Sequence, residues 1–311
     1  MTGAVSAAPT VATVSRIDFG AVQVLADDGR AIEASVPARL RGVKKALGNA
    51  VVTGDRVALA WDSGRALIDL VDPRRNAFSR RASGEREEEQ VVAANLDQVV
   101  IVAALKRPDF SHGLVDRVLV QCQRAGISAV LVLNKTDLGE MAEVEEVHAE
   151  YRRAGVQGFA TCAKTGRGVD EVQSACAGRR TLFVGHSGVG KSTLLGQLLP
   201  GTEILEGDVN EVTGKGRHTT SAAILYRSGA DTELVDTPGV RAFGLWDVGP
   251  EDLAEYYPEL RPHVGQCRFG DCRHDKEPGC GLRAALERGE IGARRFASYC
   301  KLRDELAEGR H

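Results

Sequence analysis

The segment GHSGVGKST contains the residue types that a loop needs to hold phosphate groups. Gly188 and Gly190 allow backbone N–H groups to turn toward phosphate oxygens, and Lys191 brings a positive charge to the outer phosphates of a nucleotide. The Ser192 hydroxyl is suited to Mg²⁺. An apolar strand precedes the segment and a helix follows it, as a phosphate-binding loop requires. The predicted phosphate-site residues are Gly185, His186, Ser187, Gly188, Val189, Gly190, Lys191, Ser192 and Thr193.

The segment VDTPG ends another apolar strand further along the chain. Asp236 is placed there to hold Mg²⁺ through a water molecule, and the Gly239 N–H is placed to contact a γ-phosphate. We expect Lys191 to be catalytic. We also expect His218 either to orient water and stabilise charge, or to contact phosphate or RNA without catalysis, since histidine serves both roles. The predicted Mg²⁺ ligands are Ser192, Asp236 and one of Thr219 and Thr220.

The segment NKTD, at the end of the apolar strand AVLVL, has the residues that read a guanine base. The Asp137 carboxylate can accept hydrogen bonds from guanine N1–H and the exocyclic amine, a pair of donors that adenine lacks. Asn134 is expected to brace the base edge and neighbouring loops, and the Lys135 stem to lie over the ring. The segment TCAKTGRG is expected to complete the base site, with a backbone N–H near Ala163 facing guanine O6. The predicted residues of this segment are Thr161, Cys162 and Ala163.

The order of these motifs is unusual, because the base-reading segments precede the phosphate-reading segments. Each segment follows an apolar strand, and ligands of α/β folds bind at the carboxyl ends of the strands. The termini of a domain usually lie close in space, so joining them and cutting elsewhere preserves the packing. The sequence therefore predicts a circularly permuted GTP-binding domain.

The elements around the motifs predict the fold. Residues 92–247 alternate continuous apolar strands with helical segments, which predicts a parallel sheet covered by helices, here an α/β P-loop GTPase domain. Residues 76–91 are highly charged and predict a linker.

The N-terminal part, residues 1–75, is expected to be a β-barrel of the OB-fold type with a disordered extreme N-terminus. Five short β-rich stretches with turn residues between them and no long helix lead to this prediction. A loop within it is basic, and the sequence leaves RNA contact and simple solvation equally open. Its basic residues are Arg39, Arg41, Lys44 and Lys45.

The C-terminal part, residues 248–311, contains Cys267, Cys272, His274 and Cys280 in a C-x₄-C-x-H-x₅-C pattern. Three thiolates and one imidazole fill a tetrahedral zinc shell, so we expect one structural Zn²⁺ in a small α-rich domain. Helices are expected over PEDLAEYYPEL and IGARRFASYCKLRDEL. Cys300 is interpreted as a packing residue, although it could compete as a ligand. A basic face is expected from Arg268, Arg273, Arg294 and Arg295.

The composition of the 311 residues is that of a soluble globular protein, with 43% hydrophobic and 27% charged residues. The net charge of -3 gives no general attraction to nucleic acid. No secretory signal is present at the N-terminus and no apolar run is long enough to span a bilayer, so we expect a cytoplasmic protein without membrane contact. The absence of heptads favours a monomer.

The barrel, the motif order NKTD, GHSGVGKST, GRHTT, DTPG and the cysteine spacing together resemble the ribosome small subunit-dependent GTPase A (RsgA) family. This resemblance covers nearly the whole chain from about Val11. It implies GTP hydrolysis to GDP and phosphate that is stimulated by the small (30S) ribosomal subunit, contact with 16S rRNA, and a role in late subunit maturation. It also implies that the Cys/His residues are zinc ligands. Two alternatives stay open: an RNA-binding protein with a structural guanine nucleotide, and an unrelated GTPase.

Overall fold

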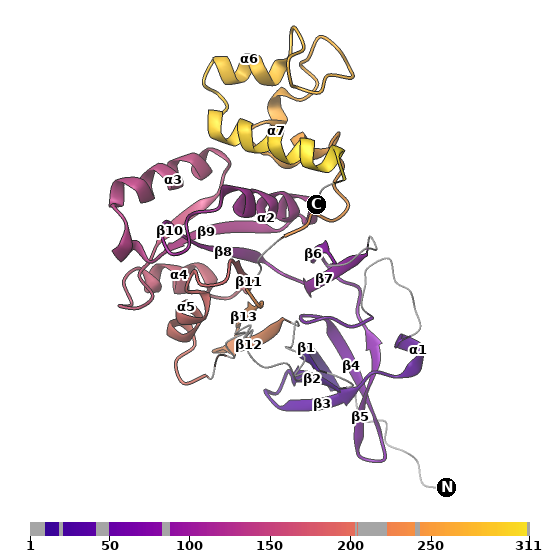
Figure 1. The fold of residues 1–311 in the computed structure, drawn as a ribbon. Helices are drawn as coiled ribbons and strands as arrows, with labels where there is room; N and C mark the ends of the chain where they lie inside the picture. The colour runs from indigo at the N-terminus through magenta and orange to yellow at the C-terminus, as the bar shows by residue number, and fades with distance from the viewer. Residues whose placement is uncertain are drawn as a thin grey trace, which may run out of the picture.

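The computed structural model describes residues 10–18, 21–41, 50–82, 88–202, 204, 223–239 and 243–309. Figure 1 shows an N-terminal barrel, a central sheet with helices on both faces, and a C-terminal unit that lies over one of these helical layers. None of the described helices is long and apolar enough to cross a membrane.

Five strands close the N-terminal barrel in the order β1-β2-β3-β5-β4, with β1 also paired to β4. Side chains alternate across each strand, and in β2 Val22 and Val24 point into a core that excludes water. The predicted five-stranded barrel is therefore confirmed. A four-residue helix, α1 (Ala38–Arg41), follows the third strand. The strands are β1 (Thr10–Asp18), β2 (Ala21–Ala26), β3 (Ala31–Ser35), β4 (Arg56–Asp62) and β5 (Arg65–Val71).

The central sheet has six strands in the order β10-β9-β8-β11-β13-β12, and all neighbours are parallel except β12 and β13. The strands that carry the base-reading motifs form one half of the sheet and precede the phosphate-reading strands in the chain, as the permuted order predicts. The strands are β8 (Gln98–Ala104), β9 (Ser128–Asn134), β10 (Gln157–Ala160), β11 (Arg180–Gly185), β12 (Ile224–Ser228) and β13 (Thr232–Asp236).

Helices cover both faces of this sheet. They are α2 (His112–Ala125), α3 (Met141–Arg153), α4 (Val169–Cys176) and α5 (Lys191–Leu198). In β8 every residue is buried, as expected for a parallel strand between two layers. Val99 and Ile101 pack in the core with α2 and α3, whereas Val100 and Val102 pack with α4 and α5. The predicted α/β architecture is confirmed.

The described part of the expected linker, residues 76–91, contains regular secondary structure. Strands β6 (Ala77–Arg81) and β7 (Glu89–Ala94) pair as an antiparallel hairpin. Phe78 is fully buried, with its ring centre 5.6 Å from that of Phe243, and Val91 is buried as well, so apolar side chains anchor an otherwise charged segment. Composition alone missed this anchor because Phe78 is buried by contact with Phe243, which is distant in the sequence.

The C-terminal unit contains α6 (Gly281–Glu287) and α7 (Ala293–Ala307), which confirms the second of the two expected helices. The first, over residues 250–260, is wrong as an α-helix: only a 3₁₀ turn at Leu253–Tyr256 forms there, followed by another at Arg261–His263. Tyr257 is extended because it precedes Pro258, and proline disfavours a helical backbone in the residue before it.

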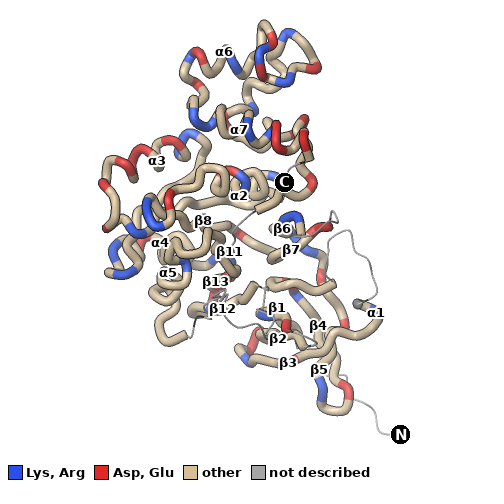
Figure 2. Tube along the Cα trace, viewed as in Figure 1, with Lys and Arg blue, Asp and Glu red and all other residues tan. Residues whose placement is uncertain are grey.

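The expected basic face of the C-terminal unit is also wrong for its two arginines in α7. Arg295 is 3% exposed, and its guanidinium pairs with Asp116 of α2 and with Glu259. Arg294 pairs with Glu146 and Glu150 of α3. Basic and acidic residues are mixed along this unit rather than separated (Figure 2).

A buried polar cluster thus connects α7 to the central α/β domain. Asp116 accepts hydrogen bonds from Arg295, from Ser298 and from the Tyr151 hydroxyl. The Arg295 guanidinium lies 4.6 Å from the centre of the Tyr257 ring and 5.2 Å from that of Tyr151. The cation is therefore enclosed by two carboxylates and two aromatic faces.

Replacing Arg295 with alanine should lower the free energy of unfolding by about 3 kcal/mol or more, because the change leaves buried carboxylates without their cation. Urea-induced unfolding followed by circular dichroism measures this. The matched control is Arg288→Ala, an arginine at the surface that pairs with Glu290, which should leave the midpoint unchanged. Equal effects of the two substitutions would contradict this interpretation.

Candidate functional site

The phosphate-binding loop connects β11 to α5 along the carboxyl edge of the sheet. Gly188 and Gly190 have φ of 81° and 90°, the left-handed backbone that glycine adopts without strain. A Cβ on Gly190 would lie 2.3 Å from Asn134 Nδ2, and one on Gly185 would lie 2.5 Å from the Val102 carbonyl oxygen. Backbone geometry therefore favours glycine at Gly188, close packing requires it at Gly185, and both reasons apply at Gly190.

The Asn134 side chain joins the base-reading segments to the phosphate-binding loop. It is 2% exposed, and its Nδ2 donates to the carbonyl oxygens of Val189 at 3.0 Å and Gly190 at 3.4 Å. Its Oδ1 accepts from the Thr161 hydroxyl at 3.1 Å and from the Ala163 N–H at 2.9 Å. One amide thus holds three segments that lie far apart in the sequence.

A backbone N–H near Ala163 was expected to face guanine O6, and the Ala163 N–H itself donates to Asn134 in this structure. Asn134 braces the neighbouring loops as expected.

Lys135 reaches across the same edge of the sheet. Its Nζ donates to the carbonyl oxygens of Gly188 at 2.6 Å and Arg107 at 2.5 Å. Sequence reasoning missed the segment around Arg107, which carries no recognisable motif. Its only signal was its position directly after β8, the strand next to β11 in the sheet.

Asp137 lies in a 3₁₀ turn, Thr136–Leu138, and is exposed. Its carboxylate accepts a hydrogen bond from the Cys162 thiol, with Sγ 3.2 Å from Oδ1. Cys162 is buried, so the carboxylate is held from the protein side while it faces solvent. The predicted base-reading residues are therefore brought together.

Lys191 and Asp236 form an ion pair at the other end of the site, and both are nearly buried. Burial raises the pKa of the Asp236 carboxyl, and the Lys191 ammonium opposes that change. A Cβ on Gly239 would lie 3.1 Å from Ser187 Cα, so the DTPG segment runs directly against the phosphate-binding loop. Ser192 follows Lys191 in the first turn of α5.

Some predicted residues lie outside the described part of the chain. They are His218, Thr219 and Thr220 of the site and Lys44 and Lys45 of the barrel loop. Arg39 of that loop pairs with Asp69 of β5.

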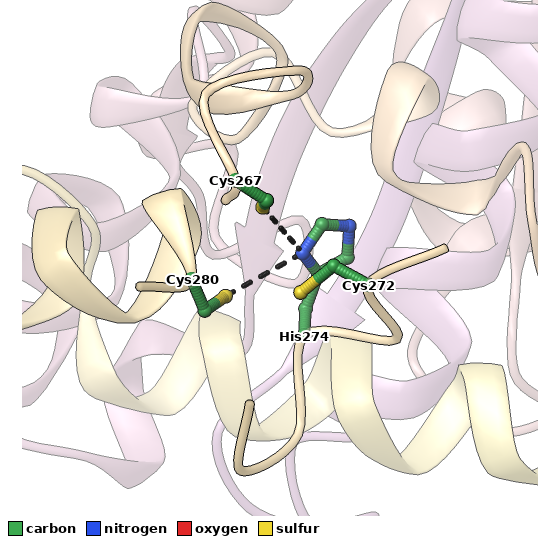
Figure 3. A group of neighbouring side chains, drawn as sticks. All are labelled: Cys267, Cys272, His274 and Cys280. Atoms are coloured by element: carbon green, nitrogen blue, oxygen red, sulfur yellow. Dashed lines mark hydrogen bonds between the residues drawn. The ribbon is translucent and has the colours of Figure 1, made fainter. Parts of the chain in front are cut away.

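The second candidate site is the Cys/His cluster of the C-terminal unit (Figure 3). The donor atoms of Cys267, Cys272, His274 and Cys280 lie within 4.8 Å of one another. His274 Nδ1 is 3.4 Å from Cys267 Sγ and 3.5 Å from Cys280 Sγ. Tetrahedral metal–sulfur and metal–nitrogen bonds give an edge of about 3.6 Å, so these separations fit a bound metal ion.

The surroundings of the cluster also suit a metal centre. The Gly281 N–H donates to Cys267 Sγ at 3.3 Å, a bond that stabilises a metal-bound thiolate. Cys300 is partly buried against the core and is not a member of the cluster, which supports its interpretation as a packing residue.

Metal analysis of the purified chain by mass spectrometry should find about one metal ion per chain. Cys280→Ala should lose most of this metal, because it removes a ligand from a closed shell. Cys300→Ala should retain it. Loss of metal to the same extent in both variants would mean that Cys300 is a ligand.

The comparisons with known proteins agree with this geometry. A family model described as RsgA GTPase matches residues 71–246. The Small ribosomal subunit biogenesis GTPase RsgA of Sodalis glossinidius is 40% identical over 270 residues, which are 83% of this chain and 77% of that protein. The RsgA 2 protein of Bacteroides thetaiotaomicron is 36% identical over 295 residues, which are 93% and 94% of the two chains.

Two solved structures have the same architecture. YjeQ from Thermotoga maritima superposes with a TM-score of 0.77 at 30% identity, over 96% of this chain and 99% of that one. YloQ, described as a circularly permuted GTPase, has a TM-score of 0.73 at 22% identity, over 99% and 98% of the two chains, and supports the fold alone. The motifs, their convergence and these relatives lead to one conclusion: the chain belongs to the RsgA GTPase family.

Proposed function

We propose that the chain binds GTP between the two ends of the site and hydrolyses it to GDP and phosphate. Asp137 accepts hydrogen bonds from the guanine edge, and Lys135 lies over the ring. Lys191 donates to the β- and γ-phosphates, which requires its ion pair with Asp236 to open. The observation that carries the proposal is the pairing of Asn134 with both groups of segments, since it holds base and phosphate sites at a fixed separation.

Mg²⁺ is the proposed companion of the nucleotide. The oxygens of Ser192 and Asp236 are the hard ligands that this ion prefers, and Thr219 or Thr220 would add another. Bound Mg²⁺ would neutralise charge on the β- and γ-phosphates. We keep His218 as the candidate that orients water, because Val240 stands directly after DTPG, where a glutamine often serves. Because this glutamine is absent, we expect the isolated chain to hydrolyse GTP slowly.

We further propose that the GTPase acts in the biogenesis of the small ribosomal subunit, as the names of its relatives state for those proteins. The 30S subunit and its 16S rRNA are the proposed partners, with the barrel loop and the C-terminal unit as contact regions. The metal of the Cys/His cluster is proposed to be one Zn²⁺, since three thiolates and one imidazole select it. We also propose that the chain is a monomer and acts in the cytoplasm.

Asp137→Asn should reverse the base preference of the site. An amide donates one N–H to the C2 carbonyl of xanthine and still accepts from N1–H, whereas guanine presents two donors to it. We expect GTP affinity to fall about a hundredfold and XTP affinity to rise, measured by competition with a fluorescent guanine nucleotide. Asp170→Asn, at an exposed position of α4, is the control. An unchanged preference in Asp137→Asn would contradict the assignment of the base site.

Purified 30S subunits should raise the GTP turnover of the chain at least about tenfold, as partners of slow GTPases do. With a non-hydrolysable analogue the chain should co-sediment with 30S and not with 50S subunits. Lys191→Ala should abolish the stimulated turnover. Fast hydrolysis without subunits, or no response to them, would instead favour a passive RNA-binding protein or a GTPase with another partner.

A further inference from the structure

One carboxylate holds both chain neighbours of His274. The Glu277 Oε1 atom accepts a hydrogen bond from the Arg273 N–H at 2.9 Å, and its Oε2 atom accepts one from the Asp275 N–H at 2.9 Å. The two oxygens of a carboxylate can accept from two N–H groups at once. The loop therefore folds back on the Glu277 side chain, which fixes the backbone on each side of the imidazole.

Two arginines hold the same neighbours through their carbonyl groups. Arg303 of α7 donates to the Arg273 carbonyl oxygen, and Arg283 of α6 donates to the Asp275 carbonyl oxygen. Both helices lie outside the metal-binding loop, residues 267–280. The loop is therefore held by the surrounding fold as well as from within.

His274 needs this support because its backbone conformation is unusual. Its φ is 62°, in the left-handed region that residues other than glycine rarely adopt. In this conformation its Nδ1 lies 3.4 Å from Cys267 Sγ and 3.5 Å from Cys280 Sγ (Figure 3). Return of this residue to an ordinary backbone would move the imidazole away from the thiols, and the strained conformation persists because its surroundings hold it.

We propose that Glu277 is a positioning residue of the metal site, which keeps His274 directed at the thiols before a metal ion binds. This inference rests on the proposed metal site, and Glu277 is not itself a member of the donor cluster. A ligand that is already in place loses less conformational freedom on binding, so the metal is held more tightly. The alternative is that Glu277 stabilises the loop as a whole, so that all four ligands depend on it equally.

The zinc affinity of the full chain, measured by competition with a chromophoric chelator, tests this role. Glu277→Ala should weaken Zn²⁺ binding about tenfold or more, as the loss of a residue that orients a metal ligand does. Glu277→Gln should weaken it less, because the amide keeps one accepting oxygen. The matched control is Glu287→Ala, which removes an exposed carboxylate from the end of α6 and should leave the affinity unchanged.

A second genetic background separates the two explanations. His274→Asn removes the imidazole, leaves three thiolates to hold zinc, and introduces a residue that tolerates the left-handed backbone. If Glu277 acts through His274, then Glu277→Ala should change zinc affinity by less than about twofold in this background.

Equal weakening by Glu277→Ala in both backgrounds would overturn the positioning role and leave the metal site itself standing. Unchanged zinc affinity in Glu277→Ala alone would overturn it as well. A wild-type chain that binds no zinc would instead overturn the proposed metal site, and the inference with it.

Discussion

The hydrogen bonds of the Asn134 side chain are the interactions on which the nucleotide site depends. Its amide donates into the phosphate-binding loop and its carbonyl accepts from Thr161 and Ala163. The permutation breaks the chain between these segments and rejoins it elsewhere, yet the same contacts hold them because packing does not depend on chain order. A buried amide with all these partners is also costly to displace, since any broken bond leaves a polar group unpaired.

The permutation also determines which segment comes after the phosphate end of the site. After DTPG the chain runs to Phe243, which packs on the β6–β7 hairpin, and to Trp246, whose N–H donates to Gln121 of α2. The same helix carries Asp116, which holds Arg295 of the C-terminal unit. Helix α2 therefore contacts both the segment that follows DTPG and the C-terminal unit that carries the Cys/His cluster.

The local geometry around the motifs could be predicted from the sequence, because motif residues carry their own geometric requirements. Gly190 and Asn134 could be placed from residue types and strand context. The burial of Arg295 could not be predicted, because an arginine in a helix is usually exposed. Only the tertiary structure brings two carboxylates around its guanidinium. Phe78 within a charged segment and Arg107 without a motif were missed because their roles come from contacts with distant segments.

A crystal structure of the chain with Mg²⁺ and a non-hydrolysable GTP analogue tests the central claim most directly. The account predicts one nucleotide whose guanine N1 and exocyclic amine lie within about 3.2 Å of the Asp137 carboxylate, while its phosphate oxygens lie equally close to Lys191 Nζ. A nucleotide held by Lys191 with its base directed away from Asp137 would contradict the convergence of the two groups of segments on a single ligand.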